Sequence, residues 1–299
     1  MNQDLVQSVW DEHVGWSRTA DLLKSRRVRW GVVVLMLTIC GAALQTLAAN
    51  LAESLNGVPV RLLVAGAGTV ALALVPFLSA SLLSPNGTRK WLRARSVSEG
   101  IKSEVYTFRA GAEPYDKPDA LGLLQQKVRN IRDWAKDLER ERALVGSPTK
   151  PAPPLLDAQA YLQLRVYQQV NQYYRPRAQR NAKLAERFQM IGIAFAGLVA
   201  VLSAVATMRG GPGSAAIGPW IAVLTTIGGS IAAYAASARY DFQATAFFAT
   251  ARQLADLAET WAASGRPAPS KEWSDFVRAS EEAISVENRG WMAKLDEPR

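Results

Sequence analysis

The feature that most constrains this chain is the stretch from Leu62 to Leu83, which contains twenty-two residues and no charge. A helix rises about 1.5 Å per residue, so this stretch would be about 33 Å long and would match a hydrocarbon core about 30 Å thick. A buried helix of a soluble protein is shorter on average and keeps a polar stripe, which this stretch lacks. The stretch therefore predicts a helix that spans a bilayer.

Three further stretches of about 20 residues lack Asp, Glu, Lys and Arg, namely Trp30 to Asn50, Phe188 to Met208 and Ile217 to Ala238. We therefore expect an all-α integral membrane protein in which four transmembrane helices form two hairpins and long cytoplasmic helices pack as a bundle. The mean hydropathy of −0.02 conceals this division, because it averages the spans with very polar segments.

The distribution of basic residues sets the expected orientation. Five lie in residues 1–29, twenty in 84–187 and eight in 239–299, whereas the two short connections hold only Arg61 and Arg209. Lys and Arg are retained on the cytoplasmic side, so both termini and the long middle segment of a multi-pass protein are expected there. This asymmetry accounts for the pI near 9.8, and no nucleic-acid partner is expected.

Basic residues beside the spans are expected to contact lipid headgroups of the bilayer. These residues are Arg26, Arg27, Arg89, Arg180, Lys183 and Arg187. Five bases between Arg175 and Arg187 could instead bind a phosphorylated ligand, but the charge rule for segments next to a membrane favours lipid. Pro176 in the same segment predicts a kink.

The chain has one histidine and one cysteine. Its only histidine, His13, lies among aromatic residues of the first helix and is interpreted as a packing or interfacial residue. Its only cysteine, Cys40, lies inside the first span and can form neither an intramolecular disulfide nor a thiol metal cluster. Residues 66–71 fit the dinucleotide pattern GxGxxG/A, but they lie within a span. We expect no enzyme activity, no cofactor and no metal site.

Apolar periodicity predicts cytoplasmic helices over residues 88–111, 120–144, 239–263 and 270–296. The second has an a/d seam that is expected to pack against another helix or another subunit. In the last, Glu287 lies on the apolar stripe and would need a basic partner. The residues assigned to cytoplasmic assembly are Leu124, Val128, Ile131, Leu138, Glu287 and Trp291.

The order of elements repeats along the chain, which predicts two tandem units. Residues 1–146 contain spans at about 30–50 and 62–83, residues 147–154 form a Pro-rich linker, and residues 155–299 contain spans at about 188–208 and 217–238. Residue identity between the halves is slight, so the repeat is one of layout.

Polar side chains inside the spans are expected to face another helix or water. Gln45 is the best candidate for a pore or an interhelical hydrogen bond, and the others are Thr38, Thr69, Ser79, Thr225, Thr226 and Ser230. Small residues at every fourth position are expected to pack the second hairpin tightly. They are Gly192, Ala196 and Ala200 in the third span and Gly229 and Ala233 in the fourth.

Two segments carry a resemblance to a known family. Trp91 to Tyr106, WLRARSVSEGIKSEVY, resembles the post-membrane helix of the SLATT superfamily, the bacterial SMODS and SLOG-associating two-transmembrane effector domains. Trp273 to Trp291, with Glu281-Glu282 and Glu287-Asn288-Arg289-Gly290-Trp291, is similar to the closing helix of a second such domain. The resemblance implies two tandem copies in the bacterial inner membrane and an effector of conflict systems that forms pores when a linked sensor signals. It supplies no catalytic residues.

The leading hypothesis is therefore a homo-oligomeric channel or pore-forming effector, gated through its cytoplasmic helices by a sensor protein or a nucleotide signal. The alternative is a non-conducting membrane scaffold or signalling protein that binds partners through those helices. A membrane enzyme that uses Glu99 or Glu104 with Glu287 lacks a supporting motif.

Overall fold

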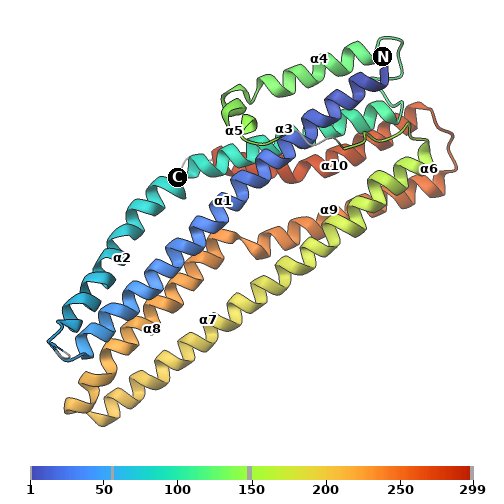
Figure 1. Ribbon diagram of the computed structural model, residues 1–299. Helices are drawn as coiled ribbons and strands as arrows, with labels where there is room; N and C mark the ends of the chain where they lie inside the picture. Colours follow the sequence, from blue (N-terminus) through green and yellow to red (C-terminus); the bar gives the residue numbers. More distant parts are fainter. Residues whose placement is uncertain (1, 55–56, 147–149, 297–299) are drawn as a thin grey trace. The chain divides into compact units, whose positions relative to one another are not determined.

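The computed structural model describes residues 2–54, 57–146 and 150–296, and it describes the side chains of 3–54, 57–146, 150–210 and 217–285. Helices make up the regular structure of these residues (Figure 1). Four helical stretches are long and apolar enough to cross a membrane. The predicted fold class, an all-helical chain with four membrane helices, is confirmed.

The apolar stretches lie in α1 (Asn2–Asn50), α2 (Val60–Leu82), α7 (Arg175–Arg209) and α8 (Gly211–Ala238). The other α-helices are α3 (Pro85–Arg109), α4 (Ala120–Asp133), α5 (Glu139–Ala143), α6 (Ala158–Tyr161), α9 (Tyr240–Ser264) and α10 (Lys271–Asp296). A 3₁₀ turn, η1 (Lys136–Leu138), precedes α5, and two π-helical segments, η2 (Leu162–Tyr167) and η3 (Gln169–Tyr174), lead into α7.

The chain divides into two compact units that do not follow its two halves. The core unit comprises residues 1–25, 85–179 and 243–299, and the membrane unit comprises residues 26–84 and 180–242. Each unit takes segments from both sides of the predicted linker at 147–154, part of which lies outside the described residues. The tandem halves therefore describe the order of elements and not two separate compact bodies.

The core unit is built around α3, which packs against α4 and α10. Its buried residues Ala94, Val97, Ile101 and Val105 recur at spacings of three and four, so they form one apolar face. The Ile131 side chain of α4 comes within 3.5 Å of the position that a Cβ on Gly100 would occupy. The seam of α4 thus packs against a helix of the same chain, which is one of the two alternatives predicted for it.

The predicted helix over 120–144 is interrupted, because α4 ends at Asp133 and α5 begins only at Glu139. The break buries Ala135 and Leu138 completely. Arg93 of α3 satisfies the freed backbone by donating from Nη2 to the Trp134 carbonyl at 2.6 Å, and it also pairs with Asp137. A side chain from another element therefore stabilises a break that periodicity does not reveal.

The membrane unit exposes large apolar side chains along its helices, as a lipid-facing surface requires. They include Val33, Met36, Leu62, Leu63, Val70, Phe77, Met190, Ile193, Val201 and Trp220. In the first hairpin α1 and α2 approach closely at two glycines. A Cβ on Gly68 would stand 3.1 Å from the Gly41 carbonyl oxygen and 3.1 Å from Leu44 Cβ.

The second hairpin does not use the predicted small-residue seam. Gly192 and Gly229 have open space where a Cβ would stand, and Ala196, Ala200 and Ala233 are exposed. The contact lies on a neighbouring face, where Phe195 Cβ comes within 3.3 Å of the Cβ position of Gly228. Small residues permit a close approach, but an aromatic side chain that fills the groove offers more contact area.

We predict that Gly68→Val destabilises the protein by about 1–3 kcal/mol, because the added carbons overpack the contact between α1 and α2. Gly66→Val is the matched control, since no atom lies within 4 Å of its Cβ position on the same helix. Thermal unfolding of the detergent-solubilised protein measures the difference. Equal unfolding temperatures for the two variants would contradict the close approach.

Candidate functional site

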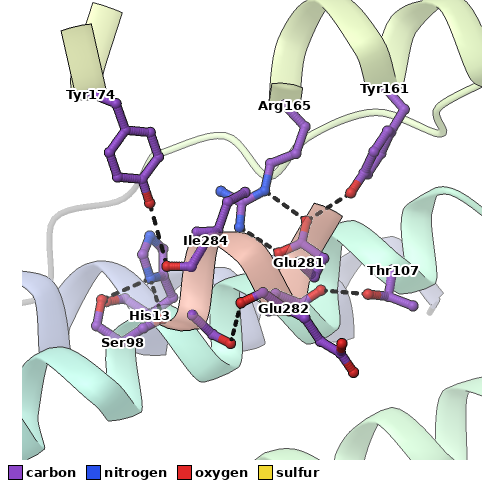
Figure 2. Close-up of polar contacts among 11 residues, drawn as sticks. His13, Ser98, Thr107, Tyr161, Arg165, Tyr174, Glu281, Glu282 and Ile284 are labelled. Carbon is purple, nitrogen blue, oxygen red and sulfur yellow. Dashed lines mark hydrogen bonds and ion pairs between the residues drawn. The ribbon is translucent and has the colours of Figure 1, made fainter. Parts of the chain in front are cut away.

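The most distinctive polar site is an ion pair in the interior of the core unit, between Arg165 of η2 and Glu281 of α10 (Figure 2). Arg165 donates from Nε to Oε1 at 2.7 Å and from Nη2 to Oε2 at 2.6 Å, so the two groups meet as a bidentate fork. The side chains are 1% and 5% exposed. A charge pair removed from water to this degree is stable only when both partners are present.

Two tyrosines complete the surroundings of the ion pair. Tyr161 donates its hydroxyl to Glu281 Oε1 at 3.0 Å, and the Arg165 guanidinium lies over the Tyr106 ring, 4.5 Å from its centroid. Asp157 positions Tyr161, because its carboxylate accepts a hydrogen bond from the Ala160 amide and so caps the N-terminus of α6, the helix that ends at Tyr161. Glu281 therefore accepts three hydrogen bonds, and α3 covers the cation.

Electrostatics keep the ion pair charged. Burial acts to lower the pKa of Arg165, but the charge and hydrogen bonds of Glu281 outweigh burial and raise this pKa above its usual value. Burial and the Glu281 charge together raise the pKa of Tyr161, so its hydroxyl remains a donor.

Glu99 and Lys102 of α3 belong to the same interior. Burial acts to raise the pKa of Glu99, but the charges of Lys102, Arg95 and Arg165 outweigh it and lower this pKa. Burial lowers the pKa of Lys102, and the Glu99 charge opposes this effect.

His13 is also buried in the core unit, where its Nδ1 lies 2.9 Å from the Ser98 carbonyl oxygen and 3.0 Å from Ser98 Oγ. Burial and the Lys102 charge lower the pKa of His13 to about 4, while the Ser98 carbonyl and Glu99 act in the opposite direction. The ring is neutral at pH 7 and joins α1 to α3. Of the two interpretations that the sequence allowed for His13, packing and the membrane interface, the structure supports packing.

Helix α10 is held at several further points. Trp273 Nε1 donates to the Ala110 carbonyl at 2.9 Å, and Tyr174 Oη donates to the Ile284 carbonyl at 3.3 Å. The rings of Trp261 and Phe276 stack at 5.2 Å between centroids. These contacts fix α10 against the end of α3 and against the segment that leads into α7.

Sequence reasoning missed the ion pair and singled out Glu287 and Trp291, whose side chains lie outside the described residues. One signal pointed to Glu281. It lies four residues after Val277 and three before Ile284, on the same apolar stripe that carries Glu287. Arg165 had no comparable signal, because the helix around it does not follow the α-helical period.

The structure places Gln45 at an interhelical contact. Its Nε2 donates to Thr69 Oγ1 at 2.7 Å and to the Ala65 carbonyl at 3.1 Å, which ties α1 to α2. Five of the other predicted hydroxyl groups each donate to the carbonyl four residues earlier in their own helix. These bonds are Thr38 to Val34, Thr69 to Ala65, Thr225 to Ile221, Thr226 to Ala222 and Ser230 to Thr226. Ser79 is half-buried, and its backbone carbonyl caps the end of α2.

Of the six residues assigned to lipid headgroups, Arg27 is half-buried and the other five are exposed. The exposed residues are Arg26, Arg89, Arg180, Lys183 and Arg187. Pro176 falls in the first turn of α7, directly after the π-helical segment. Within the described residues, no three side chains of His, Cys, Asp or Glu gather closely enough to hold a metal ion.

We predict that Glu281→Gln lowers the free energy of unfolding by about 3–5 kcal/mol, because it leaves Arg165 buried without its counter-charge. Glu282→Gln is the control, since the adjacent Glu282 is exposed, and it should change stability by less than about 0.5 kcal/mol. Urea unfolding of the purified protein measures both. Similar losses in the two variants would contradict a buried pair.

We also predict a pH dependence that comes from His13. Its pKa is lower in the folded state, so the unfolded state binds more protons between about pH 4 and pH 6.5. The contribution of His13 to the free energy of unfolding is therefore complete above pH 6.5, and it falls by about 3 kcal/mol as the pH drops to about 4. His13→Asn can keep the bond to Ser98 without titrating, because its amide nitrogen takes the position of Nδ1. Over that range the free energy of unfolding of the wild type should fall by about 3 kcal/mol more than that of this variant. Parallel curves of this free energy against pH would exclude a buried neutral histidine.

Two family models match the chain. Residues 161–291 match SMODS and SLOG-associating 2TM effector domain 1, and residues 15–121 match a family described as a protein of unknown function, DUF4231. Neither the curated proteins nor the solved structures gave a match. The first match contains α7, α8 and α9 and most of α10, and thus both apolar helices of the second hairpin and the helix that carries Glu281.

Together with four apolar helices, this match describes a multi-pass membrane protein with an effector role. Residues 161–291 of the chain therefore carry a two-transmembrane effector domain of the SLATT type.

Proposed function

We propose that the protein assembles into an oligomer in the bacterial inner membrane and opens a pore when its core unit receives a signal. The observation that carries this proposal is the match of residues 161–291 to a two-transmembrane effector domain, because the matched residues contain both a membrane hairpin and part of the packed core. The family description links such domains to SMODS and SLOG partners, which supports a sensor protein or a nucleotide signal as the activator.

Polar residues on the outside of the membrane helices support assembly. Thr69, Thr225 and Thr226 are exposed in the single chain. Polar side chains within spans normally face other helices or water. A second subunit, or a water-filled path between subunits, would provide such surroundings.

The concentration of Lys and Arg in residues 1–29, 84–187 and 239–299 supports an orientation with both termini in the cytoplasm. The core unit would then lie on the cytoplasmic side, where a signal could reach it. The exposed juxtamembrane bases would lie beside anionic headgroups. Residues 1–146 would be a second, divergent copy of the two-span unit.

A non-conducting scaffold is the second candidate, and a specific observation favours it. The hydroxyls of Thr225, Thr226 and Ser230 are already bonded to their own helix, so they do not require water. In that case the exposed face of α9, which carries Arg252 and Asp256, would bind a partner, and the spans would serve only as anchors.

We predict that purified protein in liposomes releases ions or a small dye when activated. Gln45→Leu should change this release several-fold, because it removes the bonds that join α1 to α2. Met36→Leu is the control on the same helix, since Met36 is 54% exposed, and it should behave as the wild type. A wild-type protein that passes neither ions nor dye with any activator would contradict the pore and leave the scaffold.

A further inference from the structure

The segment that joins α6 to α7 is wound in an unusual way. Residues Leu162–Tyr167 and Gln169–Tyr174 are π-helical, whereas π-helices are rare, mostly single turns, and often found at functional sites. The segment contains neither Gly nor Pro, and its Leu, Gln, Arg and Tyr residues are all compatible with an ordinary α-helix. Contacts with the rest of the core unit must therefore impose the wider winding.

The pattern of burial shows what this winding achieves. Tyr161, Arg165, Val170, Tyr174 and Ala178 are all buried. An α-helix turns about 100° per residue, so it would place Val170 about 180° away from Tyr161. Only the wider winding brings both ends of the segment to one side. There Tyr161 and Arg165 bond to Glu281, and Tyr174 bonds to the Ile284 carbonyl one turn further along α10.

The ion pair is suited to hold such a register. A buried pair adds little stability compared with apolar residues of the same size, and fixing register is the best-attested use of buried polar groups. Arg165 Nη1 has no hydrogen-bond partner among the described residues, so the hydrogen-bonding capacity of the guanidinium is not fully used. Loss of the contact with Glu281 would remove the main restraint on η2.

We propose that the segment Leu162–Tyr174 is a register switch, and that the Arg165–Glu281 ion pair is its latch. When α10 shifts and the pair separates, the segment rewinds as an α-helix. With Tyr161 held in place, rewinding of the thirteen residues to Tyr174 would then rotate the start of α7 by about 140°. Helix α7 begins at Arg175 without a break and contains the third membrane stretch, so the rotation is passed along α7. The role of this rotation in gating rests on the pore function proposed above.

Two neighbouring residues report the rewinding directly. Ala178 is fully buried and Gln179 is exposed. Gln179 lies eighteen residues after Tyr161, about five full α-helical turns, so rewinding brings Gln179 to the buried side and turns Ala178 outward. After rewinding, Gln179 should therefore be buried and Ala178 exposed, whereas local unfolding would expose both residues.

The test uses the full-length protein in lipid nanodiscs with the exposed Cys40 replaced by Ala. Ala178→Cys and Gln179→Cys are introduced separately, and the rate of modification by a soluble maleimide is measured for each. With Glu281 intact, position 179 should react at least ten times faster than position 178. Glu281→Gln should reverse this order, and Glu282→Gln, at the exposed neighbouring position, should leave it unchanged.

The double variant Arg165→Met with Glu281→Leu removes the latch without leaving a buried charge, and it decides the question if Glu281→Gln does not fold. It should also reverse the order of reactivity. An unchanged order in this variant overturns the switch, and so does fast reaction at both positions.

Dye release by the same variants in liposomes separates the switch from the pore. If the reactivity order of positions 178 and 179 reverses but no dye is released, the switch is retained and the pore is rejected. If dye is released while the order is unchanged, the pore is retained and the switch is rejected.

Discussion

The core unit depends on a charge pair that is stable only when its surroundings are complete. Taking Arg165 and Glu281 out of water carries a penalty of several kcal/mol per ion, which their attraction offsets only with good geometry and further hydrogen bonds. The bidentate fork, the Tyr161 hydroxyl and the Tyr106 ring provide these conditions. Each comes from a different place in the chain, so η2, α6, α3 and α10 are tied to one arrangement.

This dependence explains why the compact units cross the tandem order of the sequence. Arg165 and Glu281 both belong to the second half of the chain, within the residues that match the effector domain. Part of the cover of the pair comes from the first half, because the Tyr106 ring lies over the guanidinium. The second half thus brings its own polar pair, and the first half helps to shield it from water.

Charge-free length was sufficient to predict the four membrane helices, since few other structures can use such a stretch. Periodicity also predicted a helix over residues 88–111, where the structure has α3. The same reasoning failed where contacts override the α-helical period. Periodicity predicted neither the break in the helix after Asp133, which Arg93 stabilises, nor the π-helical winding that brings Arg165 to Glu281. The small-residue stripe of Gly192 failed for another reason, because it permits close approach without saying which face is used.

The two hairpins of the membrane unit differ in how they could respond to a rotation of α7. Gln45 joins α1 to α2 by side-chain bonds, so any rotation between those helices must break them. In the second hairpin, Thr207, Thr225 and Thr226 donate within their own helices, and rotation leaves these bonds intact. The contact of Phe195 with Gly228 is apolar and non-directional, so the ring can slide over other small residues. A register change in the core unit would therefore move the second hairpin more readily than the first, because Gln45 fixes the first by hydrogen bonds, whereas the contact of Phe195 with Gly228 in the second is apolar.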